Sequence, residues 1–176
     1  VDAPASELRL PRNSMDECVD FIVSELDAAA VDLPTTPVND ENYARLTKGV
    51  ALSFKCRTLL QAASPLYNGN ADYANLKNED GKQLINQSYD ENKWKQAADA
   101  YKAFIDEFVP SVYDLYRKNG PGGVYSPFLS LRDVMLDQWN KEIIFGRPED
   151  ENARNYEVTP FHNGFASEVR GSGGLG

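Results

Sequence analysis

The sequence predicts a mainly α-helical fold in which three long amphipathic segments supply most of the core. Three observations support this prediction. Apolar residues recur at steps of three and four in each segment. Capping residues precede the segments and prolines follow them. A single short stretch, 142–146, has the β-branched character of a strand. The chain of 176 residues is long enough for one domain with a sizeable core.

The first helix is expected over residues 14–33. Ser14 and Glu17 have the spacing of a capping box, in which each side chain accepts a hydrogen bond from the backbone of the other residue. Apolar side chains then form one stripe: Val19, Ile22, Leu26, Ala29 and Leu33. Pro34 and Pro37 follow the stripe and end the helix.

The second helix is expected over residues 47–64 and should be buried on two sides. One line along it is formed by mostly small residues, namely Gly49, Ser53, Cys56, Leu60 and Ala63. The adjacent line is bulkier, with Val50, Phe54 and Leu59. Small side chains at this spacing allow close approach of another helix. Pro65 ends the helix, and residues 70–89 are polar and aperiodic, as in an insertion loop.

The third helix is expected over residues 90–108, with Asp90 as the N-cap. Its apolar stripe consists of Trp94, Ala97, Ala98, Tyr101, Ile105 and Phe108. The spacing Trp94-x-x-Ala97-Ala98-x-x-Tyr101 is typical of the first helix of a tetratricopeptide repeat, although no strict 34-residue period is visible. We therefore expect Trp94 and Tyr101 to be mostly buried between paired helices. Beyond Pro110 we expect a short helix over 127–137, the strand 142–146 and an irregular segment over 147–176.

Charge and composition exclude several classes of function. The formal net charge of −9 and the absence of a Lys/Arg cluster argue against nucleic-acid binding. No run approaches the roughly 20 apolar residues of a membrane-spanning helix. Cys18 and Cys56 match no zinc pattern, and we expect two buried thiols. A bridge between them stays open as the alternative.

No arrangement of residues predicts catalysis, a metal site or a cofactor. There is no G-x-S-x-G elbow, and His162 is the single histidine. Gly171–Gly176 matches the dinucleotide fingerprint in letters but lacks the strand and helix that the fingerprint requires. Many carboxylates are present and none forms a marked pair, so a glycan hydrolase remains an alternative. We expect a binding protein and not an enzyme.

Several blocks of the chain resemble the SusD/RagB family of outer-membrane nutrient-binding lipoproteins of Bacteroidetes. They are Arg45–Leu60 with Gln61-Ala-Ala-Ser-Pro-Leu-Tyr-Asn-Gly69, Phe21-Ile-x-x-x-Leu-x-x-Ala-Ala with Leu33-Pro34, Trp94-Lys-Gln-Ala-Ala-Asp-Ala, and Glu142-Ile-Ile-Phe. Cys56 stands where the family usually has alanine. The resemblance identifies residues 1–176 as the central part of one SusD-like domain. It implies an α-superhelix of tetratricopeptide-like helix pairs.

The resemblance also implies a function and a location. Such a protein binds an oligosaccharide or other nutrient at the cell surface, without catalysis, and delivers it to a TonB-dependent, SusC-like transporter. It is held at the outer membrane by a lipid anchor that would precede this chain. A tetratricopeptide scaffold that binds only protein is the second alternative. Neither the ligand, the natural termini nor the oligomeric state follows from the residues.

We expect the ligand to bind a loop in the irregular C-terminal segment. The loop is aromatic and polar and has no periodicity, and functional residues concentrate on loops held by a rigid scaffold. Aromatic faces stack on sugar rings, while amide and imidazole groups hydrogen-bond to hydroxyls. The residues concerned are Asn155, Tyr156, Phe161, His162 and Asn163. The alternative is that Phe161 and Phe165 cover the end of the helical layer.

Overall fold

The computed structural model describes residues 10–37, 45–137 and 140–146. Three long helices follow one another along the chain: α2 (Met15–Asp32), α3 (Lys48–Ala63) and α4 (Asn92–Phe108). Between α3 and α4 lies a single 3₁₀ turn, η2 (Ala71–Tyr73). A second 3₁₀ turn, η3 (Pro121–Gly123), and a short helix, α5 (Pro127–Asp133), follow α4. All belong to the compact unit Val1–Phe145. The described residues contain no β-sheet, so the mainly helical prediction is confirmed.

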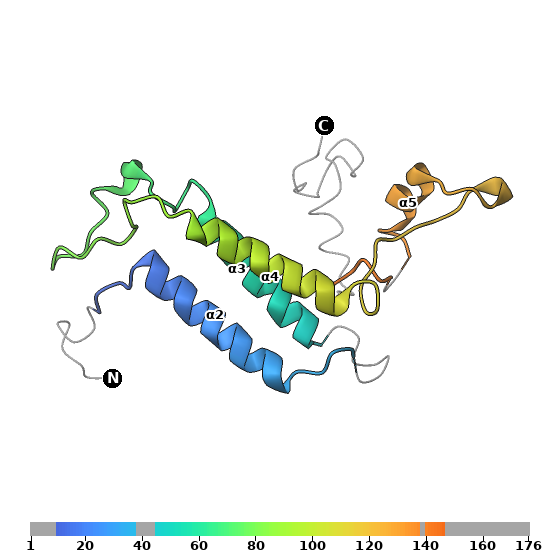
Figure 1. Cartoon of the computed structure of the whole chain (residues 1–176), viewed down its shortest axis with the longest axis horizontal. Coiled ribbons are helices and arrows are strands. Elements are labelled where there is room, and N and C mark those ends of the chain that lie inside the picture. Colours follow the sequence, from blue (N-terminus) through green and yellow to red (C-terminus); the bar gives the residue numbers. More distant parts are fainter. Residues whose placement is uncertain (1–9, 38–44, 138–139, 147–176) are drawn as a thin grey trace, which may run out of the picture. The chain divides into compact units, whose positions relative to one another are not determined.

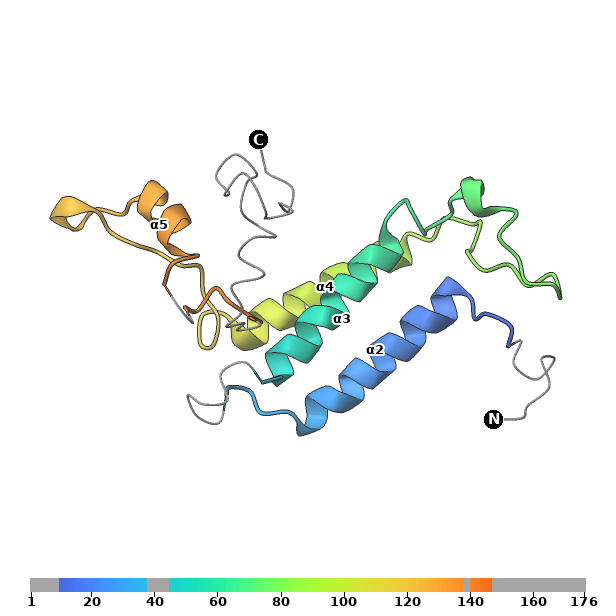
Figure 2. The same cartoon turned by 180° about the vertical axis from the view of Figure 1, so that it is seen from behind.

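Helix α3 lies between α2 and α4, and successive helices run in opposite directions (Figures 1 and 2). On the side of α3 toward α2, Phe54 and Thr58 line a groove together with α2 residues, whereas Cys56 belongs to a core cluster with Phe104 and Phe108 of α4. The small residues of α3 allow α2 and α4 to approach it closely, as expected from the line of Gly49, Cys56 and Ala63. The expected burial of this helix on two sides is confirmed.

The start of α2 is fixed by the predicted capping box. The Ser14 backbone N–H donates to Glu17 Oε2 at 2.8 Å, and the Glu17 N–H donates to Ser14 Oγ at 3.3 Å. Lys82, in the segment between α3 and α4, donates to the same carboxylate at 2.6 Å. Glu17 therefore joins the first turn of α2 to a residue 65 positions later in the chain.

These hydrogen bonds make the stability of the protein depend on pH. The Lys82 ammonium, followed by the Ser14 N–H, lowers the pKa of Glu17 from 4.5 to about 2. A carboxyl whose pKa is lower in the folded state stabilises the fold above its unfolded pKa and loses this effect as the pH falls toward its folded pKa. The contribution should therefore be complete above about pH 5 and decline between pH 5 and 2.

We expect Glu17→Gln to remove this part of the pH dependence. The amide can still accept from Ser14 in a capping box, but it cannot pair with Lys82 as a charge. Urea unfolding at several pH values should show the variant less stable at neutral pH, with the difference from the parent shrinking toward pH 2. Glu25→Gln, on an exposed position of the same helix, is the control. A constant difference across the pH range would contradict the assignment.

The N-cap of α4 is Glu91, which forms no side-chain cap hydrogen bond, so the predicted N-cap, Asp90, lies one residue too early. The Asp90 carboxylate accepts from the Asn92 N–H at 2.9 Å. The buried side chains of α4 are Ala97, Phe104 and Phe108. Trp94 and Tyr101 are 38% and 37% exposed, so they are only partly buried and lie outside the buried core. The reason is geometric: α3 covers one edge of the apolar arc of α4, and these two residues lie on the other edge.

The segment between α3 and α4 is held in place by Asn68. Its buried side-chain amide donates to Ala63 O at 3.3 Å and Asp90 O at 2.9 Å, and its carbonyl accepts from Asp90 N–H at 2.8 Å. Gly69 follows with φ +75°. The end of α3 and the start of α4 are thereby tied together across the whole predicted insertion loop.

The last described segment differs from its prediction in two respects. Helix α5 ends at Asp133, four residues before the expected limit of 137, and continues only as turns. Residues 142–146 form no strand. A strand needs a neighbouring ladder of backbone partners, but here Ile143 N–H donates to Asn140 O within a turn at 3.1 Å. The apolar run instead packs its side chains, with Ile144 against the Cys56, Phe104 and Phe108 cluster.

Candidate functional site

The residues predicted to bind ligand lie outside the described part of the chain. Asn155, Tyr156, Phe161, His162 and Asn163 all belong to 147–176. Their role stays a prediction, as does the irregular nature of that segment.

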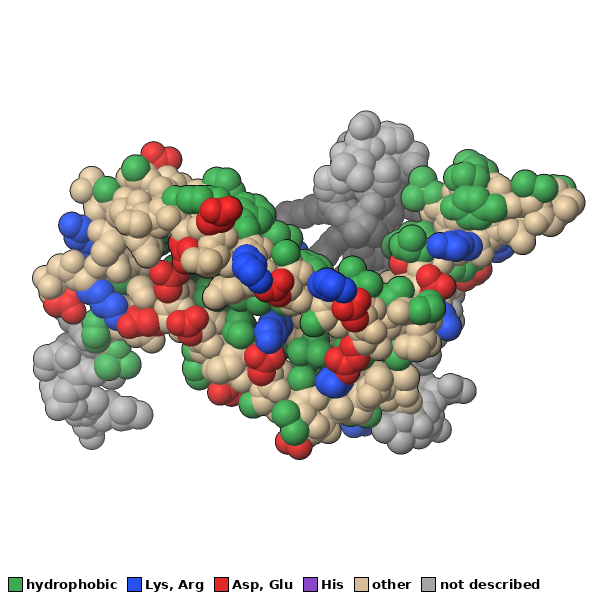
Figure 3. All heavy atoms as spheres, viewed as in Figure 1, with side chains coloured by type: hydrophobic (Ala, Val, Ile, Leu, Met, Phe, Trp, Pro, Cys, Tyr) green, Lys and Arg blue, Asp and Glu red, His purple; other side chains and the backbone are tan. Residues whose placement is uncertain are grey.

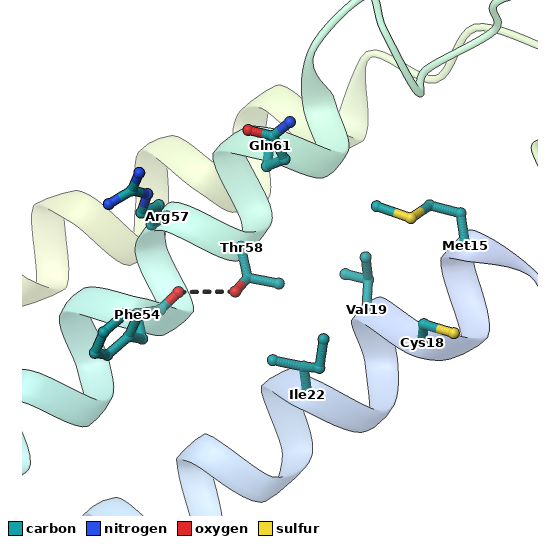
Figure 4. Close-up of a pocket in the computed structure, with 8 residues that line it drawn as sticks. All are labelled: Met15, Cys18, Val19, Ile22, Phe54, Arg57, Thr58 and Gln61. Carbon is teal, nitrogen blue, oxygen red and sulfur yellow. Dashed lines mark hydrogen bonds between the residues drawn. The ribbon is translucent and has the colours of Figure 1, made fainter. Parts of the chain in front are cut away.

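Within the described residues, α2 and α3 enclose a groove of about 320 Å³ (Figure 4). This α2/α3 groove is lined by four residues from each helix: Met15, Cys18, Val19 and Ile22 from α2, and Phe54, Arg57, Thr58 and Gln61 from α3. Its volume is at the lower end of the range typical of small-molecule sites.

The surface of the α2/α3 groove is mainly apolar. Val19 is buried, whereas Ile22 and Phe54 remain more than two-fifths exposed. The Thr58 hydroxyl donates to Phe54 O at 2.9 Å, a helical i−4 bond that leaves its methyl group free for apolar contact (Figure 4). The Phe54 ring also meets Phe145 edge-to-face, with centroids 6.4 Å apart. The groove therefore fits an apolar group, with Arg57 and Gln61 available to bond polar atoms beside it.

The two thiols differ in exposure. Cys18 is exposed and lines the α2/α3 groove, so the expectation that it is buried is wrong. Cys56 is buried as expected, and desolvation raises its pKa. Both are free cysteines, so the alternative of a bridge between them is not observed. Val19, the neighbour of Cys18 in the same groove, is buried.

A polar cluster surrounds the buried carboxylate of Asp133 at the end of α5. Lys118 Nζ lies 2.8 Å from Asp133 Oδ2, and Arg132 pairs with both carboxylate oxygens. The Arg132 hydrogen bond, followed by that of Lys118, lowers the pKa of Asp133 to about 2. Nearby, the hydrogen bond to Asp137 raises the pKa of Tyr116. These groups tie residues 116–118 to α5 and hold the carboxylate ionised, which does not suit a general acid.

No group of three His, Cys, Asp or Glu side chains within 10–37, 45–137 and 140–146 could hold a metal ion. Over the same ranges, no helix has the length and apolar character needed to cross a bilayer.

The sequence predicts an apolar or buried position for four residues of the groove and makes no such prediction for the others; the four are Cys18, Val19, Ile22 and Phe54. The signal that could have found the groove is a different line along α3, in which Phe54, Thr58 and Gln61 stand at steps of four and three, opposite Val19 and Ile22. Periodicity assigns these residues to one helix face, but it does not say how completely a neighbouring helix covers that face.

Two solved structures resemble the chain. The Bacteroides thetaiotaomicron protein BT4246 is 30% identical over 90% of this chain, with a TM-score of 0.67. A selenomethionine form of BT4246 is 28% identical over 90% of the chain, with a TM-score of 0.63. The chain spans 31% and 32% of the lengths of these structures, respectively. No protein-family model and no curated protein matches. The similarity fits an origin in Bacteroidetes.

Proposed function

We propose that the chain is the helical part of a SusD/RagB-like protein that binds oligosaccharide at the cell surface without transforming it. The observation that carries the proposal is the block from Gln61 to Gly69, on which the family resemblance chiefly rests. In the structure, the Asn68 side chain of this block hydrogen-bonds to the Asp90 backbone and so holds the end of α3 near the start of α4. Gly69 makes the turn. The likeness to BT4246 over 90% of the chain is compatible with the Bacteroidetes origin that this assignment implies.

The proposed partners follow from this assignment. The bound nutrient would pass to a TonB-dependent, SusC-like transporter, and a lipid anchor outside these 176 residues would hold the protein at the outer membrane. The net charge of −9 is compatible with anchoring through lipid, because an acidic surface is not attracted to an anionic leaflet.

The proposed ligand site is the loop with Asn155, Tyr156, Phe161, His162 and Asn163. Tyr156 and Phe161 would stack on sugar rings, and the amide and imidazole groups would bond to hydroxyls. We expect Tyr156→Ala and His162→Ala each to weaken glycan binding by about 1–3 kcal/mol while leaving the melting temperature almost unchanged. Calorimetry on the complete gene product, after a glycan-panel screen, measures both quantities.

A matched control is Tyr89→Ala, because Tyr89 is an exposed tyrosine of the loop before α4. It should leave affinity unchanged. Loss of stability without loss of affinity in the two loop variants would mean that the loop covers the helical layer. Unchanged affinity in both variants would refute the proposed site.

The alternative of a glycan hydrolase is tested by incubating the protein with the same glycan panel. Our proposal expects no release of reducing ends. The carboxylates of Glu17 and Asp133 already have lysine partners and lowered pKa values, so neither suits protonation of a leaving group. Enzyme-dependent release of reducing ends would contradict the proposed absence of catalysis.

One observation favours the second alternative, a protein-binding scaffold. The α2/α3 groove is lined mainly by apolar side chains, which fit the apolar face of a peptide helix better than the hydroxyls of a sugar. Cys18 in the groove provides a reporter, since Cys56 is buried. If the groove binds a transporter peptide, labelling of Cys18 by a maleimide should slow when that peptide is added; unchanged labelling would exclude this use of the groove.

A further inference from the structure

The α2/α3 groove differs in charge from the helix that forms one of its sides. Helix α2 carries six acidic residues and no basic one, namely Asp16, Glu17, Asp20, Glu25, Asp27 and Asp32. Among the described residues that line the groove there is no carboxylate, and Arg57 is the one cation. Elsewhere the two signs are interspersed, as Figure 3 shows on the face where α4 lies in front. The groove is therefore an apolar surface with one positive charge, in a chain whose net charge is −9.

Apolar and polar groups occupy different parts of the groove. The Val19 and Ile22 side chains point from α2 toward α3, and the Thr58 methyl group points toward α2 (Figure 4). Arg57 and Gln61 are four residues apart on α3, so their side chains are neighbours on one edge of that helix. Both lie on the α3 side of the groove, beyond the apolar side chains that face one another across it (Figure 4). A ligand with an apolar chain and a polar head fits this division.

The size and the chemistry of the groove define the class of this ligand. Its volume of about 320 Å³ favours a narrow molecule, such as one with an unbranched alkyl chain. The Met15 thioether is flexible and adapts to the shape of such a chain. Arg57 takes part in no ion pair among the described residues. Its guanidinium can bind a carboxylate through two parallel N–H donors, and the Gln61 amide supplies a further donor.

We infer that the α2/α3 groove binds a single-chain fatty carboxylate, with the alkyl chain between α2 and α3 and the carboxylate on Arg57 and Gln61. Each methylene group that leaves water favours binding. The guanidinium selects an amphiphile of negative charge over one of positive charge. The inference does not rest on the proposed glycan site, because the groove and the loop with Tyr156 and His162 share no residue.

The competing occupant is the apolar face of a peptide helix. Such a helix is about 10–12 Å across with its side chains, so it lies over a groove and inserts only some of its side chains. Those side chains are apolar and need no carboxylate beside Arg57. The two occupants therefore differ in how strongly their binding depends on the charge of Arg57.

Maleimide labelling of Cys18 in the complete gene product reports whether the groove is occupied, because Cys18 lines the groove. Loss of the signal in Cys18→Ser identifies the labelled thiol. The probe is dodecanoate below its micelle-forming concentration, and dodecyltrimethylammonium has the same chain length with the opposite charge. At a concentration about ten times its Kd, dodecanoate should slow the labelling about tenfold, whereas the cationic amphiphile should leave it nearly unchanged.

Two variants test the two parts of the groove, and each has a matched control. Arg57→Gln should weaken dodecanoate binding about tenfold, because a charge-assisted hydrogen bond is lost. Arg117→Gln removes an exposed cation outside the groove and should have no effect. Ile22→Ser should weaken binding about fivefold through lost apolar contact, whereas Phe21→Ser, at an exposed neighbour outside the groove, should not. Circular dichroism checks that each variant is folded.

Each result decides the inference. Protection by dodecanoate that is weakened in Arg57→Gln and Ile22→Ser supports it. Equal protection by both amphiphiles, or unchanged affinity in Arg57→Gln, overturns it, because the charge then selects nothing. A Cys18 that does not react in the complete gene product also overturns it, since another element then covers the groove. Protection by a transporter peptide but not by dodecanoate assigns the groove to the protein-binding alternative. Glycan affinity is a separate measurement, so failure of the glycan proposal is recognised independently.

Discussion

Replacing Phe108 by alanine should lower the free energy of unfolding by about 3–5 kcal/mol, as for large aromatic residues in cores. Phe108 is fully buried, and its ring centroid lies 4.9 Å from that of Phe104 and 5.9 Å from that of Tyr113. The truncation removes contacts with α3, α4 and the segment after α4 at once, because Cys56, Phe104 and Tyr113 surround one ring. Urea unfolding followed by circular dichroism measures the change.

Truncations on the outer edge of the same helix provide the controls. Ile105→Ala should cost less than about 1 kcal/mol, and Trp94→Ala about 1–2 kcal/mol, because both side chains are partly solvated already. Equal losses for Phe108→Ala and Ile105→Ala would show that the core does not lie on the Phe104 and Phe108 edge of α4.

Gly69→Ala should destabilise the protein by about 2–5 kcal/mol, for two separate reasons. The residue has φ +75°, which costs a side chain about 1–2 kcal/mol. An added Cβ would also lie 2.6 Å from Tyr89 N and 2.8 Å from Tyr89 Cα, and overpacking of this kind costs about 1–3 kcal/mol. The backbone there cannot retreat easily, because Asn68 holds the adjacent Asp90 through two hydrogen bonds.

The Gly81→Ala variant separates the conformational cost of a positive φ from the steric cost of the added Cβ. Gly81 has φ +85°, but a Cβ at this position would meet nothing within 4 Å. Its substitution should therefore cost only the conformational part, about 1–2 kcal/mol. If the two variants lose the same stability, as measured by urea unfolding, the close approach of Tyr89 to Gly69 does not matter energetically.

The ends of the helices could be predicted because they depend on neighbours in the chain. Ser14 and Glu17 form the predicted capping box, and Thr47 and Asp90, at the expected starts of the next two helices, each accept from a backbone N–H two or three residues away. A local hydrogen bond of this kind is encoded within a few residues. The expected strand at 142–146 failed for the complementary reason: a strand depends on a distant partner, which the composition of the run does not reveal.

The candidate site shows the same division. The apolar character of Val19, Ile22 and Phe54 is visible in the sequence, and each was assigned to a helix face. That these residues line a groove, with Cys18 exposed beside them, depends on how closely α2 approaches α3. The assignment of Trp94 to the core failed similarly, because the tetratricopeptide spacing describes a helix that has its partner, whereas here Trp94 stays 38% exposed.

By itself, the sequence determined where the helices lie, how they begin and which of their faces are apolar, since these properties follow from local hydrogen bonds and from a period of 3.6 residues. Only the tertiary structure decided which apolar edge is buried. Phe104 and Phe108 meet Cys56 of α3, whereas Trp94 and Tyr101, on the same helix and equally aromatic, stay partly in solvent. A side chain is buried only when a second surface covers it, and that second surface comes from elsewhere in the chain.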